Sequence, residues 1–117
     1  MKKLTIVIAV LFSIFCTKTS MAQQTTATLK SDTVKVWGNC GMCKNRIEKA
    51  AKGAGASTAS WNSTTQMLIV SYDAGNSSLE KIQKAIAKKG HDTRDFEATD
   101  ADYNKLPGCC LYERRPM

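Results

Sequence analysis

The sequence GNCGMC occupies residues 38–43 and marks the point where an extended, valine-bearing segment gives way to a helical pattern. It places Cys40 in a loop, three residues before Cys43 at the expected start of a helix. A helix start carries unpaired backbone N–H groups and the positive end of the helix dipole. Both favour the thiolate, which is the form of cysteine that binds metal or attacks disulfides. The stretch therefore predicts a reactive pair of thiols between a strand and a helix.

The residues on both sides of this stretch predict an α+β fold. Val34 and Val36 alternate with polar residues, as in a half-buried strand, whereas apolar residues from Cys43 onward recur at helical spacing. The segment at residues 91–97 is polar and is expected to form an edge strand. This order, βαββαβ, predicts a ferredoxin-like sandwich, a four-stranded antiparallel sheet with both helices on one face. The expected elements are strands at residues 32–37, 56–61, 66–72 and 91–97, and helices at residues 43–54 and 78–89. For the second helix, Ser77 and Glu80 fit a capping box with Ser77 as the N-cap.

Residues 1–22 have the layout of a secretory signal peptide, with a basic start, an apolar run and small residues before a cleavage site after Ala22. The apolar run is shorter than the roughly 20 residues that a membrane span needs. We therefore expect an exported, periplasmic protein without stable membrane insertion after cleavage. An alternative is a lipid anchor on Cys16, which the bulky Phe15 before it disfavours.

The charge of the chain gives little support to nucleic-acid binding. The formal net charge of the 117 residues is +7, and it falls to +4 (14 basic minus 10 acidic residues) when the three lysines of residues 1–22 are removed. The basic residues are spread along the chain without interleaved aromatic residues. A mild positive balance suits an acidic partner surface or is simply a solvated face.

Short motifs around the two cysteines resemble those of the heavy-metal-associated domain family. They are Ile-Glu-Lys-Ala at residues 47–50, Val-Ser-Tyr-Asp at 70–73 and Lys-Gly-His at 89–91. This family includes small copper chaperones, the N-terminal modules of copper-exporting ATPases and periplasmic mercury-binding proteins. The resemblance covers residues 33–97, which leaves a flexible leader at residues 23–32 and a tail at residues 98–117.

The chain departs from the family pattern in its loop, after its second helix and in its tail. The family's loop usually reads G-M-x-C-x-x-C with a buried methionine, whereas the loop here is one residue shorter and Met42 lies between the cysteines. His91 stands where the family commonly has an aromatic residue after glycine. Cys109 and Cys110 lie outside the family core altogether.

The resemblance implies metal capture by Cys40 and Cys43. Sulfur ligands suit a soft ion, Cu(I) first and Hg(II) as well. His91 is a candidate third ligand or proton-dependent lid, and the alternative is an ordinary surface histidine. Cys109 and Cys110 are also candidate ligands, because residues 98–109 span about 25–30 Å and can return to the loop. With them the site could be tetrahedral and hold Zn(II). The alternatives are a disulfide to the loop or unrelated thiols.

The predicted function is to bind a heavy-metal ion, most simply Cu(I), and to transfer or sequester it, without enzymatic activity. The expected partners are the metal ion and a metal-transporting membrane protein or another metal-binding domain. Mercury or zinc scavenging is an alternative. Another is a thiol–disulfide oxidoreductase that uses Cys40 and Cys43. Such an enzyme usually needs a cis-proline facing the site, and the only prolines, Pro107 and Pro116, lie in the tail.

Overall fold

The computed structural model describes residues 28–117. The predicted signal peptide at residues 1–22, the alternative anchor on Cys16 and the first half of the leader lie outside these residues. Within the described part of the chain, no helix is long and apolar enough to cross a membrane. In chain order the elements are β1 (Leu29–Lys35), α1 (Gly41–Gly53), β2 (Ala56–Asn62), β3 (Met67–Asp73), α2 (Leu79–Lys88), α3 (Asp100–Asn104) and the 3-10 turn η1 (Gly108–Cys110).

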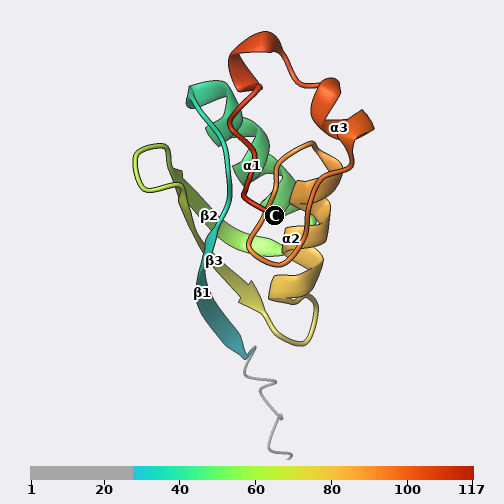
Figure 1. Cartoon of the computed structure of the whole chain (residues 1–117). Helices are drawn as coiled ribbons and strands as arrows, with labels where there is room; N and C mark the ends of the chain where they lie inside the picture. Colours follow the sequence, from blue (N-terminus) through green and yellow to red (C-terminus); the bar gives the residue numbers. More distant parts are fainter. Residues whose placement is uncertain (1–27) are drawn as a thin grey trace, which may run out of the picture.

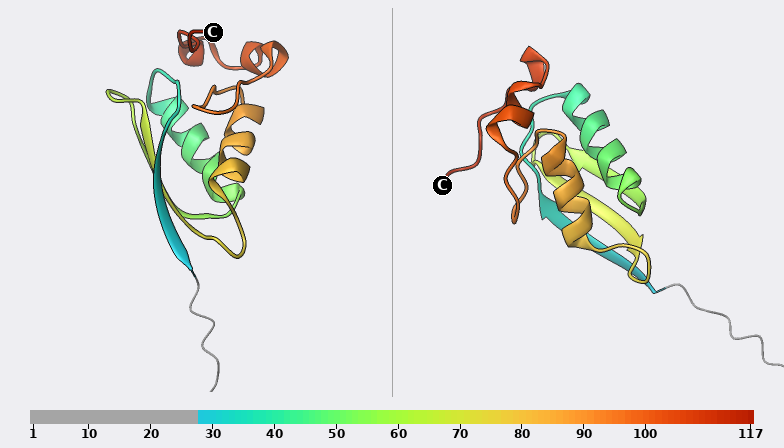
Figure 2. Two further views of the ribbon diagram at one scale, coloured as in Figure 1. Left: turned by 60° about the horizontal axis from the view of Figure 1, so that its bottom comes forward. Right: turned by 90° about the vertical axis from the view of Figure 1, so that its right-hand side faces the viewer.

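The three strands form one antiparallel sheet in the order β1-β3-β2, and α1 and α2 cover one of its faces (Figures 1 and 2). The sheet and α1 pack against each other through the apolar residues that the sequence pattern predicts to face the core. Val34 and Val36, Leu68 on β3 and Ile47 on α1 are all fully buried. The α+β architecture is confirmed, and it places the loop between β1 and α1 at one end of the sheet.

The prediction of a fourth strand at residues 91–97 is wrong for the described chain, in which the sheet has three strands. This segment lies beside the end of β1 but makes only an isolated bridge, between Val36 and Thr93. Thr93 then turns the chain back, because its N–H donates to the carbonyl of Phe96 at 2.7 Å. The buried amide of Gln83 holds the turn by donating to the carboxylate of Asp95 and accepting from its N–H.

The second helix begins one residue later than the expected capping pattern. Ser78, not Ser77, is the N-cap of α2, and its hydroxyl accepts from the N–H of Lys81 at 3.1 Å. The hydroxyl of Ser77 instead donates to the carbonyl of Ala54 at 2.6 Å, which ties the start of α2 to the end of α1. Both helices are thus fixed at the end of the domain away from the cysteine loop.

Candidate metal site

Cys40 and Cys43 lie at the start of α1. Cys40 is the N-cap residue and Cys43 is in the first turn, so their Sγ atoms are 4.0 Å apart. Cys43 is fully buried, and the N–H of Asn39 donates to its Sγ at 3.4 Å. Cys40 is only half-buried. The pair therefore presents one accessible and one buried sulfur from a single turn of chain.

The backbone at the helix start activates the Cys40 thiol. The N–H groups of Cys43 and then of Met42 face its Sγ and lower its pKa to about 7, against the small opposing effect of burial. The Sγ lies near these groups without the geometry of a full capping hydrogen bond. No acidic residue occupies the first turn of α1, so nothing there opposes a negative sulfur. Near neutral pH a substantial fraction of Cys40 is thiolate.

An aromatic ring supports the loop from beneath. Trp61 on β2 is buried, and its Nε1 donates to the carbonyl of Val36 at 2.9 Å. A Cβ on Gly38 would lie 3.0 Å from this ring and 3.2 Å from the Cβ of Cys43, so the loop needs a glycine for close packing. Met42 is 52% exposed and is not buried beneath the site. In this chain tryptophan packs under the cysteine loop.

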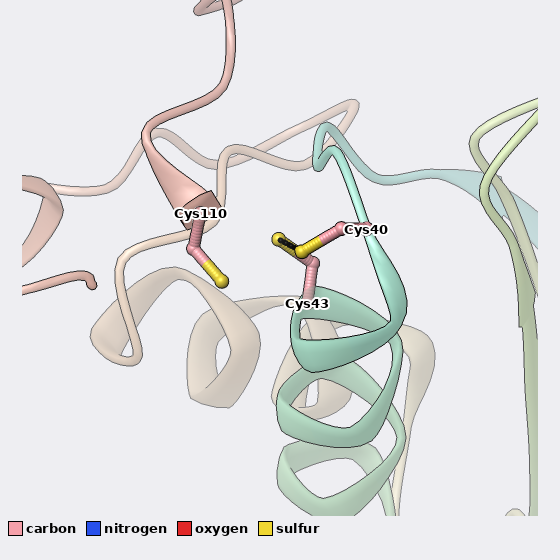
Figure 3. A group of neighbouring side chains, drawn as sticks. All are labelled: Cys40, Cys43 and Cys110. Atoms are coloured by element: carbon pink, nitrogen blue, oxygen red, sulfur yellow. Dashed lines mark hydrogen bonds between the residues drawn. The ribbon is translucent and has the colours of Figure 1, made fainter. Parts of the chain in front are cut away.

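The tail brings a third sulfur to the pair. The turn η1 places Cys110 opposite Cys40 and Cys43, as Figure 3 shows, and the three Sγ atoms lie within 4.8 Å of one another. We refer to these three residues as the three-cysteine cluster. Cys110 is fully buried, and burial followed by the neighbouring thiols raises its pKa. The Cys40 Sγ also donates to the carbonyl of Cys109 at 3.5 Å. Loop and tail therefore meet directly at the cluster, and all four cysteines of residues 28–117 are free thiols.

Tyr112 anchors the tail next to the cluster. Its hydroxyl donates to the carbonyl of Gly90 and accepts from the N–H of Asp92, both at 2.7 Å. Tyr103 on α3 donates to the Tyr112 carbonyl at 2.7 Å. Gly90 has φ +100°, and a Cβ there would come within 2.8 Å of the carbonyl of Asp102. A glycine at residue 90 thus allows the tail to pass close to the end of α2.

A buried ion pair fixes the tail just beyond Tyr112. Asp92 is fully buried and accepts from the Nε and Nη2 of Arg114 at 3.0 and 2.8 Å, and from the N–H of Ala98 at 2.8 Å. Burial would raise the pKa of Asp92, but the hydrogen bonds from Arg114 and from backbone N–H groups, together with the charge of Arg114, outweigh it and the pKa is lowered. Arg114 thus holds the tail by a two-pronged contact with a buried carboxylate.

His91 is fully buried, so the alternative of a surface histidine is wrong. Its Nδ1 lies 2.9 Å from the carbonyl of Trp37, and its ring stacks on Tyr112 with centroids 5.3 Å apart. Burial lowers its pKa, which favours the neutral ring. Its Nε2 has no hydrogen-bond partner in the described part of the chain. His91 does not join the three-cysteine cluster, and its role as ligand or lid stays a prediction.

Cys109 lies at the surface, next to the three-cysteine cluster but not part of it. Its Sγ is 3.9 Å from that of Cys110 and donates to the Sδ of Met42 at 3.3 Å. Sequence reasoning gave no role to Met42, Tyr112 or Arg114. For the last two the signal was present, since an aromatic and an arginine just after a cysteine pair are plausible anchors, but their partners are about 20 residues away.

Residues 26–92 match the heavy-metal-associated domain, and the chain belongs to that family. Among solved structures it is similar to the CopZ metallochaperone, with 27% identity over 55% of this chain and 98% of that chain and a TM-score of 0.53. It is also similar to oxidized MerP from Ralstonia metallidurans CH34, with 27% identity over 56% of this chain and 93% of that chain and a TM-score of 0.53.

A third similar structure is the N-terminal domain of a potential copper-translocating P-type ATPase from Bacillus subtilis in the Cu(I)-loaded state. The identity is 25% over 56% of this chain and 84% of that chain, with a TM-score of 0.52. No curated protein matches the chain. The predicted family is confirmed, and because members of this type carry metal ions, the predicted non-enzymatic function is confirmed on that ground.

Proposed function

We propose that this protein binds one soft metal ion, Cu(I) above all, in the three-cysteine cluster and transfers it to a partner. The observation that carries this proposal is the meeting of three thiol sulfurs within 4.8 Å. Metal–thiolate bonds are about 2.3 Å long, so a single ion between these sulfurs can bind all three after a small adjustment. The low pKa of Cys40 supplies a first thiolate near neutral pH.

The number and type of donors favour Cu(I) over Zn(II). Soft thiolate ligands select Cu(I), whereas structural Zn(II) usually has four tetrahedral ligands. Among the described residues the cluster holds three such donors, and Cys109, whose sulfur contacts Met42, is not one of them. The similar ATPase domain in its Cu(I)-loaded state supports copper, and mercury is the alternative cargo because the family includes mercury-binding proteins. Zinc scavenging would need Cys109 or His91 to move into the site.

We also propose that the protein is exported to the periplasm after cleavage behind Ala22, and that it exchanges metal there with a metal-transporting membrane protein or another metal-binding domain. A groove of about 700 Å³ between α1 and α2 is suited to bind a partner with an acidic surface. Its charged lining is entirely cationic, and Met42 at the edge of the cysteine loop belongs to the same groove. The four cations are Arg46, Lys49, Lys88 and Lys89.

The test is anaerobic Cu(I) titration of reduced protein against a competing chelator. The double substitution of Cys40→Ser and Cys43→Ser is expected to abolish tight stoichiometric binding, because it removes two of the three sulfurs of the cluster. Cys109→Ser is the matched control and should keep full affinity. Tight binding by the double variant would refute the site. Metal analysis of protein from its native compartment would separate Cu(I) from Hg(II) and Zn(II).

A further inference from the structure

Two more sulfur atoms stand next to the three-cysteine cluster, on its solvent side. The Cys109 Sγ donates to the Met42 Sδ at 3.3 Å and lies 3.9 Å from the Cys110 Sγ. Met42 belongs to the first turn of α1 and Cys109 to η1, so this contact joins residues 67 positions apart in the chain. The five sulfurs of loop and tail therefore form one continuous set.

The five sulfur-bearing residues differ in their exposure to solvent. Met42 and Cys109 are exposed, Cys40 is half-buried, and Cys43 and Cys110 are fully buried. A large exposed methionine beside an exposed cysteine offers a thioether and a thiol to the solvent, and both are soft donors. By contrast, an ion can reach the buried sulfurs only past the outer layer of side chains.

We infer that Met42 and Cys109 are an entry pair, an exposed two-sulfur site that captures the soft ion first and passes it inward to the three-cysteine cluster. This inference rests on the proposed metal-binding function. It assigns separate roles to the two tail cysteines, with Cys109 acting in acquisition and Cys110 in the final site.

The distances allow the ion to move inward without losing its sulfur ligands. Two bonds of about 2.3 Å can bridge sulfurs up to roughly 4.6 Å apart. The Met42–Cys109 distance of 3.3 Å and the Cys109–Cys110 distance of 3.9 Å are within this limit. The Cys40–Cys43 distance of 4.0 Å is within it as well. The Cys110 sulfur and the two loop sulfurs lie within 4.8 Å of one another, so this last step needs a small side-chain adjustment. Each step then forms one metal–sulfur bond before another breaks.

The exchange balances without any redox step. Cys109 releases its proton to solvent when its sulfur binds the ion, whereas the Met42 thioether binds without losing a proton. Cys110 releases its proton to solvent as its sulfur replaces Met42. Cys40 and Cys43 then bind as thiolates and release to solvent any proton that they carry, while Cys109 leaves the ion and takes up a proton from solvent. The ion keeps its charge throughout, and release to a partner follows the same steps in reverse.

The test compares the rate of uptake with the affinity at equilibrium. Cu(I) is supplied from a chromogenic chelator without oxygen, and uptake is followed by stopped-flow absorbance. In the full chain, the double substitution of Met42→Leu and Cys109→Ser should slow uptake by roughly tenfold or more, the scale on which supporting groups of metal sites act. Affinity and the sulfur count from X-ray absorption should stay unchanged. Met117→Leu, at the fully exposed last residue, is the matched methionine control.

Two results would overturn the entry pair. One is uptake by the double variant at the wild-type rate. The other is a loss of affinity together with one sulfur ligand, which would make Met42 or Cys109 part of the final site. Both substitutions are on the surface, and thermal unfolding would verify that the variant is folded. If the Cys40→Ser, Cys43→Ser variant still bound Cu(I) tightly, the metal-site proposal itself would fail, whereas a failed rate test alone leaves it standing.

Discussion

The loop with Cys40 and Cys43 and the tail with Cys110 reach the same cluster by different physical routes. The two loop sulfurs are positioned by local structure, because Cys40 is the N-cap of α1 and Cys43 lies in its first turn. The tail is held by long-range contacts instead, through Tyr112 to Gly90 and Arg114 to Asp92. The chemistry differs in the same way. Backbone N–H groups lower the pKa of Cys40, whereas burial raises that of Cys110.

The largest expected effect is a difference in thiol reactivity between loop and tail. In metal-free, reduced protein at about pH 7, close to half of Cys40 is thiolate, and Cys110 remains protonated and buried. Iodoacetamide should therefore label Cys40 roughly several hundredfold or more faster than Cys110, which is both protonated and buried, as measured by peptide mass spectrometry. Labelling of Cys40 should fall as the pH drops below 7, because its thiolate is then protonated.

Labelling in urea provides the control for this difference. Unfolding removes both the helix start and the burial, so the two cysteines should then react at similar rates. Equal rates in the native protein would contradict the contrast between an activated loop thiol and a protected tail thiol.

The next effect concerns the long-range anchor of the tail. Arg114→Met leaves the fully buried carboxylate of Asp92 without its two-pronged partner. Removing one partner of a buried ion pair typically costs about 3 kcal/mol, so we expect the free energy of unfolding in urea to fall by about that amount. Arg94→Met is the matched control. Its pair with Asp95 is half-exposed, and exposed pairs contribute at most about 1 kcal/mol.

Equal losses from the two substitutions would show that the tail does not depend on the buried pair. The same variants also test the link between anchoring and binding. If Arg114 positions Cys110, Arg114→Met should weaken Cu(I) binding, while Arg94→Met should not.

The difference between loop and tail also explains which parts of the fold and of the site could be predicted from the sequence. Val34, Val36, Ile47 and Leu68 follow simple two-residue or helical periodicity, so the sheet and α1 could be predicted from them. The C-x-x-C spacing at a helix start likewise made the two loop thiols predictable. Each of these features depends on residues that are neighbours in the chain.

Residues 91–97 show why the rest could not be predicted. Their polar sequence reads as an edge strand, yet Asp92 and Thr93 are buried. Arg114 pairs with the buried Asp92, and the amide of Gln83 holds Asp95 in the turn that follows. Neither pairing has a sequence pattern. The position of Cys110 has the same origin. Residues 98–109 are long enough for the tail to return to the loop, but the contacts of Tyr112 and Arg114 determine which of its two cysteines faces the loop.

The smallest effect tests whether the tail adds a ligand or only a cover. Cys110→Ser removes the buried tail sulfur but keeps Tyr112 and Arg114, so the tail should stay docked. If Cys110 is a ligand, Cu(I) affinity should fall roughly tenfold, or about 1.4 kcal/mol, and the sulfur count from X-ray absorption should drop from three to two. Cys109→Ser should leave the affinity and the count of three unchanged, because its side chain lies outside the cluster. A count of two in the unsubstituted protein would mean that the loop holds the ion alone, and the tail would then protect the site without binding metal.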